Sequence, residues 1–189
     1  AGASIVNMGD AMDGAFTAAD TGSGTDDSVT FNITDADDIN VYAGAAITTT
    51  GYEVVNFNTT NGSTTATTTT AQTVGAVSLT ADTLGVTKLV ITGNRNLTTG
   101  VITAATVDAS GFTGALSMQT NRLVGSAGIN VITGGSGDDT LIGDTDATTN
   151  ITGGAGDDTI TGGTDYETLD GGAGADTIVG GGGNDTLIG

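Results

Sequence analysis

Aspartate recurs at one fixed place in a repeated glycine-rich pattern near the end of this 189-residue chain. Four nine-residue units follow the pattern Gly-Gly-x-Gly-x-Asp-x-aliphatic-x, and each carries an aspartate in its sixth position. Carboxylates beside glycines can do the chemistry of a cation site, because carboxylate and backbone carbonyl oxygens are the ligands that hard divalent cations take. The sixth-position aspartates are Asp139, Asp158, Asp176 and Asp185.

The elements that must position these aspartates follow from the eighth position of the units. A glycine-rich run could be a flexible linker, since glycine loses more conformational entropy on ordering than any other residue. An aliphatic residue at the eighth position argues against a linker, because it falls within a short, threonine-flanked run suited to a strand. Complete units begin at Gly134, Gly153, Gly171 and Gly180. Weaker units are Gly125–Thr133, Gly143–Thr152 and Gly162–Asp170. The eighth-position aliphatic residues are Ile132, Leu141, Ile160, Leu169, Ile178 and Leu187.

Each unit therefore predicts a six-residue turn followed by a three-residue strand whose central side chain points into a narrow core. Two units make one coil of about 18 residues, and the coils stack in parallel. Stacking about 4.8 Å apart sets successive sixth-position carboxylates side by side, where each pair repels by about 3.5 kcal/mol at an effective dielectric near 20. A divalent cation removes that repulsion, and Ca²⁺ fits better than Mg²⁺ because it accepts six to eight oxygens in flexible geometry.

This spacing resembles the RTX (repeats-in-toxin, haemolysin-type calcium-binding) family over about 65 residues, 125–189. The resemblance implies a parallel β-roll that binds several Ca²⁺ ions between stacked turns, through the sixth-position acids and the carbonyls of the turns. Glycines at the second and fourth positions are the turn residues to which the resemblance assigns these carbonyl ligands. They are Gly135, Gly137, Gly154, Gly156, Gly172, Gly174, Gly181 and Gly183.

The two sides of the predicted roll are unequal, because alternate units share a side. On one side Asp139, Asp158 and Asp176 fall in line, and we expect one ion between each neighbouring pair. On the other side, only the gap between Glu167 and Asp185 has acids in both units. We interpret Asp138 and Asp157 in the fifth position as solvated turn residues that could lend charge, while Asp144, Asp146 and Asp165 displace expected glycines and weaken the case for ions at their turns.

Residues 1–124 predict a second region of irregular, β-rich solenoid coils that precede the roll. Its first part is acidic, and Asp27 lies in a fragment similar to positions four to eight of the repeat with one residue inserted. Asp27 is therefore a further candidate calcium ligand, and a solvated acidic turn is the alternative interpretation. A threonine-rich stretch follows, which we interpret as a loop between residues 59 and 71. Several segments resemble those found before RTX units in bacterial surface-layer proteins. Strands are predicted at Val29–Ile33, Ile39–Tyr42, Val54–Phe57, Val77–Leu79, Leu89–Ile91, Val101–Ile102 and Leu116–Met118.

Composition excludes several classes of function. The net charge of −19 leaves only three basic residues, so direct binding of nucleic acid is excluded as a function. The chain has no histidine and no cysteine, which removes the catalytic triads and the usual zinc sites, and it has no tryptophan to stack on sugars. A polysaccharide lyase would have to use Lys88 or Arg95 as its base, and surface charge is the simpler interpretation of both. No run of about 18 apolar residues predicts a membrane span.

We therefore expect a non-enzymatic, all-β protein that is secreted and lies at the cell surface. One hypothesis is a structural segment of a bacterial surface layer or matrix, which folds on extracellular Ca²⁺, self-associates into a lattice and contacts cell-surface polysaccharide. The alternative is a type I secretion and folding module of a larger toxin, adhesin or secreted enzyme. The chain starts without methionine and ends on the first residue of another unit, so we expect it to be part of a longer protein.

Overall fold

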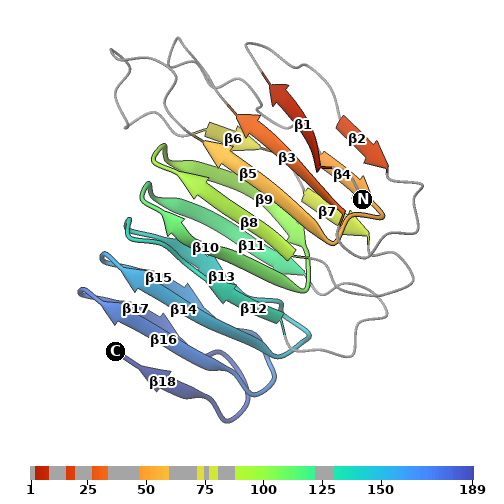
Figure 1. Cartoon of the computed structure of the whole chain (residues 1–189). Coiled ribbons are helices and arrows are strands. Elements are labelled where there is room, and N and C mark those ends of the chain that lie inside the picture. The colour runs from red at the N-terminus through yellow and green to blue at the C-terminus, as the bar shows by residue number, and fades with distance from the viewer. Residues whose placement is uncertain are drawn as a thin grey trace.

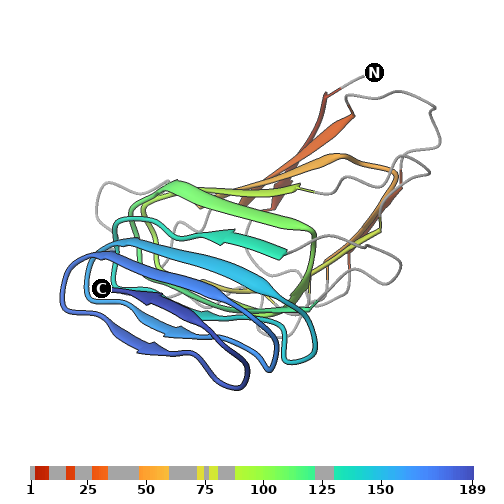
Figure 2. The same ribbon diagram turned by 90° about the horizontal axis from the view of Figure 1, so that it is seen from below.

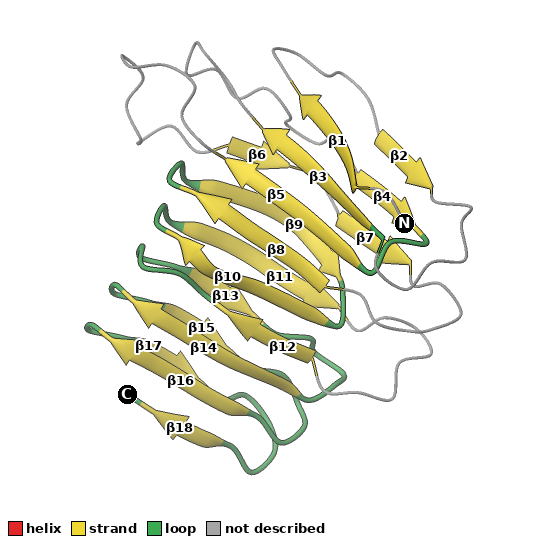
Figure 3. Ribbon diagram, viewed as in Figure 1, coloured by secondary structure: helices red, strands yellow, loops and turns green. Residues whose placement is uncertain are grey.

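Two parallel sheets face each other along the whole length of the computed structural model (Figure 1). The structure describes residues 3–8, 16–19, 27–33, 47–59, 72–74, 77–80, 88–121 and 130–189. Strand follows strand in these ranges, and none of them forms a helix (Figure 3). The part of the chain that the structure describes therefore holds no helix long and apolar enough to cross a membrane.

The first sheet has nine strands in sequence order, all parallel. They are β1 (Ala3–Met8), β3 (Ser28–Ile33), β5 (Val54–Thr59), β8 (Lys88–Gly93), β10 (Thr106–Phe112), β12 (Asn130–Thr133), β14 (Thr149–Ala155), β16 (Thr168–Ala173) and β18 (Thr186–Ile188). The second sheet lines the opposite wall and also runs in sequence order. It contains β2 (Phe16–Ala19), β4 (Ile47–Thr50), β7 (Val77–Thr80), β9 (Leu97–Thr103), β11 (Leu116–Asn121), β13 (Thr140–Ile142), β15 (Thr159–Thr161) and β17 (Thr177–Val179), and β6 (Gln72–Val74) also pairs with β9.

The chain winds between the two sheets as a flattened coil, which Figure 2 shows from one end. From β8 onward, strands of the first and second sheet alternate along the sequence, so each pair of strands completes one turn of the coil. Intervals between coils are uneven upstream: Val55 pairs with Leu89 and Leu89 pairs with Val107, although the first interval in sequence is almost twice the second. The predicted all-β solenoid of irregular coils leading into a regular roll is confirmed.

The core lies between the sheets and is built from one inward side chain for every two strand residues. In the roll, Ile132, Ile151 and Leu169 stack as register partners in the first sheet, and Leu141 and Ile160 do so in the second. All five are buried, while their strand neighbours reach the surface. Four of the six predicted eighth-position residues, Ile132, Leu141, Ile160 and Leu169, therefore form the core of the roll. The prediction is wrong for Leu187, which is 51% exposed because β18 pairs only with β16, and Ile178 is partly buried.

Strand lengths in the roll differ between the sheets. The second-sheet strands β13, β15 and β17 have three residues each, as predicted. Strands β14 and β16 of the first sheet are longer, because Gly154 pairs with Gly172 and Ala155 with Ala173 inside the predicted turns. The predicted strand at Ile39–Tyr42 and most of the predicted threonine-rich loop lie outside the described residues. Strands β1, β2, β4, β6 and β10 had no separate sequence prediction.

Upstream coils have a larger apolar core than the roll. Phe31 and Phe57 meet edge to face with their ring centroids 5.6 Å apart, and Phe112 is also fully buried. Such aromatic pairs contribute about 0.5–1.5 kcal/mol beyond the burial of their area. Leu89, Ile91 and Ile102 are fully buried in the same apolar core. The sheets run unbroken from these coils into the roll, through the β10–β12 and β11–β13 pairs.

Replacement of Ile160 by alanine tests the narrow core of the roll. Ile160 is fully buried and stacks between Leu141 and Ile178, so its loss leaves a cavity that the backbone cannot close. We expect Ile160→Ala to reduce the free energy of unfolding by about 2–5 kcal/mol in calcium. Denaturant unfolding followed by circular dichroism measures the difference. The control is Val179→Ala, whose side chain is 51% exposed, and a similar loss in both variants would contradict the packing described here.

Candidate metal centre

Three turns of the roll stack in one column, which we call the first turn column: residues 134–139, 153–158 and 171–176. The sixth-position carboxylate of each turn points to the coil before it. Asp139 donates its backbone N–H to Asp158 Oδ1 at 2.8 Å, and Asp158 donates its own to Asp176 Oδ1 at 3.0 Å. Leu116 donates in the same way to Asp139 Oδ1 at 2.8 Å. The structure thus brings the three predicted aspartates into one line, with one sixth-position carboxylate in each gap between coils.

Some carboxylate oxygens in this column are buried and have no hydrogen-bond partner. Asp158 is 1% exposed, and its Oδ2 accepts no hydrogen bond; the buried Oδ2 of Asp176 also has none. Asp139 differs, because Gly135 donates its N–H to Asp139 Oδ2 at 2.9 Å. An unpaired buried carboxylate oxygen is costly unless a cation neutralises it, and a calcium ion takes such oxygens as ligands. The residues present therefore fit Ca²⁺ at Asp158 and Asp176.

Electrostatics in the first turn column disfavour negative charge in the absence of a cation. Burial, together with the neighbouring charges of Asp139 and Asp176, raises the pKa of Asp158 to about 6, against the effect of the hydrogen bond from the Asp139 backbone. Burial likewise raises the pKa of Asp139, against the effect of hydrogen bonds from Gly135 and Leu116. A carboxyl group with a raised pKa destabilises the folded state when it ionises, so a bound divalent ion would offset that cost.

Glycine at the second and fourth positions lets backbone carbonyls of one turn lie against the next turn. Gly154, Gly156, Gly172 and Gly174 all have φ between 96° and 150°, a conformation that disfavours side chains. A Cβ on Gly154 would collide with the carbonyl oxygen of Gly135, and one on Gly172 with that of Gly154. Close-packed carbonyl oxygens beside unpaired carboxylates make a set of hard oxygen donors. Gly137, Gly181 and Gly183 are packed equally tightly, the last two also with positive φ.

The turns of residues 143–149, 162–167 and 180–185 form a second turn column. Glu167 donates its backbone N–H to Asp185 Oδ1 at 3.0 Å, so the structure brings the two predicted acids together. Glu167 is only 2% exposed, yet neither of its carboxylate oxygens has a hydrogen-bond partner. Burial raises the pKa of the Glu167 carboxyl, and contact with Asp185 raises it further. This gap has the same features that fit a cation in the first column.

Asp144, Asp146 and Asp165, which replace expected glycines, do not add buried carboxylate ligands like those of the sixth position. Asp146 donates its N–H to Asp144 Oδ1 at 2.9 Å, and Asp144 donates its N–H to Thr149 Oγ1 at 3.2 Å. These bonds close the turn locally. The carbonyl oxygen of Asp165 packs against Gly183, where a Cβ would collide with it. The structure therefore gives no support to Asp144, Asp146 or Asp165 as additional side-chain ligands, although the turn of Asp165 also holds Glu167.

Asp27 lies far upstream of the roll, in the turn that precedes β3. Its side chain is 3% exposed, and its backbone N–H donates to Glu53 Oε2 at 2.7 Å. Glu53 has the same place before β5, and its buried Oε1 has no hydrogen-bond partner. Sequence patterns did not indicate Glu53. The signal lies in the register, because each acid directly precedes a strand of the first sheet, as Glu167 and Asp185 do.

These sites are not clusters of acids. Within the described ranges, no group of three or more acidic, histidine or cysteine side chains gathers as a conventional metal site. The candidate sites instead combine one or two carboxylates with backbone carbonyls of glycine turns. That arrangement suits Ca²⁺, which accepts carbonyl oxygens readily, and does not suit Zn²⁺, which takes nitrogen and sulfur ligands.

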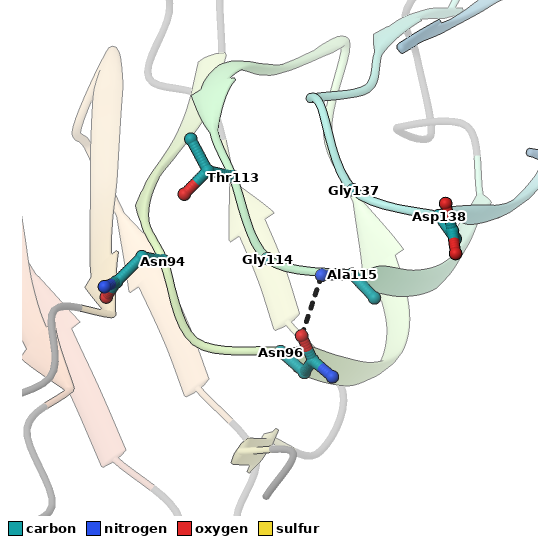
Figure 4. A pocket seen from close by; sticks show the side chains of 7 residues that line it. All are labelled: Asn94, Asn96, Thr113, Gly114, Ala115, Gly137 and Asp138. Carbon is teal, nitrogen blue, oxygen red and sulfur yellow. Dashed lines mark hydrogen bonds between the residues drawn. The ribbon is translucent and has the colours of Figure 1, made fainter. Parts of the chain in front are cut away.

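A polar groove of about 540 Å³ continues the first turn column into the upstream coils (Figure 4). Ala115 donates its N–H to Asn96 Oδ1 at 2.9 Å across the groove, and Asp138 lies at its far end. Asn96 thus bonds the following coil with its side-chain oxygen. The groove is lined by Asn94, Asn96, Thr113, Gly114, Ala115, Gly137 and Asp138.

Comparison with known families identifies the repeats. The family model described as RTX calcium-binding nonapeptide repeat (4 copies) matches residues 119–149, 145–166 and 167–189. Comparison with curated proteins and with solved structures gives no match. The matched residues contain both turn columns and every candidate ligand except Asp27.

Replacement of Asp158 by alanine tests the stacking of the first turn column. Asp158 enters only the gap toward residues 134–139, and its backbone N–H, which bonds Asp176 Oδ1, is kept in alanine. We therefore expect Asp158→Ala to cost one ion, not the two expected if the Asp158 carboxylate served the gaps on both of its sides. Asp185→Ala also removes a carboxylate from a single gap and is expected to cost at most one ion. Calcium titration calorimetry gives the number of ions bound by each variant. Loss of two ions in Asp158→Ala would contradict the direction of its side chain.

The raised pKa values predict an unusual pH dependence for the calcium-free protein. A carboxyl whose pKa in the folded state lies above its usual value stabilises the fold below that usual value and loses this contribution as pH rises through the folded pKa. For Asp158 this window runs from 3.8 to about 6. We expect circular dichroism of the decalcified protein to show more strand structure at pH 5 than at pH 7.5. Less strand structure at pH 5 would contradict the burial of these acids.

Proposed function

Residues 119–189 belong to the RTX family of calcium-binding repeats, and from this premise we propose that the chain is a calcium-locked structural segment of a secreted bacterial surface-layer or matrix protein. One observation carries the proposal: the repeat turns hold buried carboxylate oxygens of Asp158, Asp176 and Glu167 that have no partner. Buried charges of one sign oppose folding, so the fold needs a cation between its coils.

Calcium acts in this proposal as the ligand that selects the folded state. In low calcium, the acids repel one another and the roll stays open. In the millimolar calcium of an extracellular medium, each ion that binds only the folded state adds RT ln(1 + [Ca²⁺]/Kd) of stability, or about 2.7 kcal/mol at one hundred times Kd. A few such ions contribute about as much as the whole stability of a typical domain, about 5–15 kcal/mol.

The basic residues support a structural role over a catalytic one. Lys88 Nζ lies 2.7 Å from Asp108 Oδ2, and a hydrogen bond from Lys88, aided by Ser110, lowers the pKa of Asp108 to about 2. Arg95 is completely buried, so its interpretation as a surface charge is wrong. Neither side chain is placed to act as the base of a polysaccharide lyase, because one is paired with a carboxylate and the other is out of contact with solvent.

Self-association into a surface lattice is part of the proposal. The likeness of segments before the roll to those found before RTX units in bacterial surface-layer proteins supports it. Cell-surface polysaccharide is the second partner we propose, and the polar groove beside Asn96 offers amide and hydroxyl groups of the kind that bind sugars.

Removal of calcium tests the proposed function directly. We expect the far-ultraviolet circular dichroism spectrum to show strand structure in millimolar calcium. EGTA should abolish most of the strand signal that residues 125–189 contribute. Readdition of calcium should restore the spectrum, whereas magnesium at the same concentration should not, because it demands a tighter octahedral shell. A fragment that stays equally folded and equally heat-resistant without calcium would overturn the proposal.

A further inference from the structure

The fifth-position aspartates of the roll point in the opposite direction from the sixth-position aspartates. Asp157 donates its backbone N–H to Asp138 Oδ1 at 2.9 Å, and Ala175 donates its own to Asp157 Oδ1 at 2.9 Å. Asp138 and Asp157 therefore reach forward to the following coil, while Asp158 and Asp176 reach back to the preceding coil. Although both fifth-position side chains are exposed, a backbone hydrogen bond holds each one in place.

The opposite directions place two carboxylates in each gap of the first turn column. The gap between residues 134–139 and 153–158 receives Asp138 from one wall and Asp158 from the other. The next gap receives Asp157 and Asp176 in the same manner. These charges affect one another, since Asp138 contributes to the raised pKa of Asp158. Each gap therefore carries two negative charges, which one divalent cation balances.

The second turn column reaches the same charge by a different route. Its fifth-position residue is Tyr166, which has no negative charge and is largely exposed. The second carboxylate in this gap comes from Glu167, whose longer side chain lies beside that of Asp185. Three gaps in the roll thus hold the pairs Asp138/Asp158, Asp157/Asp176 and Glu167/Asp185.

A fourth gap, between residues 112–115 and 134–139, provides the internal comparison. Ser117 pairs with Thr140, so the residue aligned with Asp138 is Ala115, which has no charge to add. In this gap Asp139 is the only aligned acid, and both of its oxygens accept backbone N–H groups. An unpaired buried oxygen remains at Asp158 and at Asp176, where a fifth-position aspartate faces it, and none remains at Asp139.

We propose that Asp138 and Asp157 set the affinity and the charge selectivity of the two ion sites in the first turn column, each by completing a compartment of two carboxylates. This inference rests on the proposed calcium function and assigns a role to acids that the repeat pattern leaves variable. The role is electrostatic, because Asp138 and Asp157 act on the ion through their charge while Asp158 and Asp176 offer the buried, unpaired oxygen.

Replacement by asparagine removes the charge and keeps the side-chain oxygen that accepts the hydrogen bond. We expect Asp138→Asn and Asp157→Asn each to weaken one calcium site by about 3- to 10-fold in titration calorimetry at low salt, with the number of ions unchanged. The matched control is Asp170→Asn, which removes one charge from β16 in the first sheet, away from these gaps. We expect it to change affinity by less than about 2-fold.

A trivalent lanthanide separates charge from packing. Coulomb energy scales with ionic charge, so Asp138→Asn should weaken terbium binding by a larger factor than calcium binding. A general loosening of the fold would weaken both ions equally and also lower the melting temperature at saturating calcium. Affinities like those of the Asp170→Asn control, or equal losses for the two ions, would overturn this inference while leaving calcium binding by the native protein intact. Failure of the native protein to bind calcium would overturn the proposed function itself.

Discussion

Repulsion between carboxylates on neighbouring coils is the constraint on which the roll depends. Parallel strands set the coils about 4.8 Å apart, and no side-chain rotation can move acids anchored in stacked glycine turns far from one another. Backbone N–H groups offset part of this repulsion. At Asp139, those of Leu116 and Gly135 donate hydrogen bonds to the carboxylate. At Asp158, Asp176 and Glu167, buried oxygens remain without donors, so the balance is left to a cation.

The upstream coils share the architecture of the roll and achieve stability by different means. Between residues 88 and 121, the only acid is Asp108, which is paired with Lys88. Large apolar side chains such as Phe112 and Leu116 fill the space between the sheets there. All three basic residues of the chain fall within residues 88–122. Apolar burial therefore stabilises the middle of the stack, whereas in the roll, where the core narrows to one aliphatic residue per strand, we propose that bound ions supply the remaining stability.

The nine-residue period and the buried eighth position made the roll predictable from sequence, and with it the alignment of Asp139, Asp158 and Asp176. Three features escaped prediction, because they depend on register between coils that are distant in sequence. The insertion in residues 143–152 hid Ile151 from the core pattern, although it pairs with Ile132. Glu53 has no repeat around it, and only pairing of β3 with β5 brings it to Asp27. The direction of the Asp138 side chain cannot be deduced from residue type.

In the part of the chain that the structure describes, the strands of each coil pair with those of the coils before and after it, and the bonds that join them run along the axis of the stack. Tension applied along that axis would load the hydrogen-bonded rungs and the carboxylate gaps one after another, in series. The weakest gap would then determine the force at which the molecule lengthens. With calcium in these gaps, as proposed, the force at which the solenoid extends would depend on the calcium concentration around it.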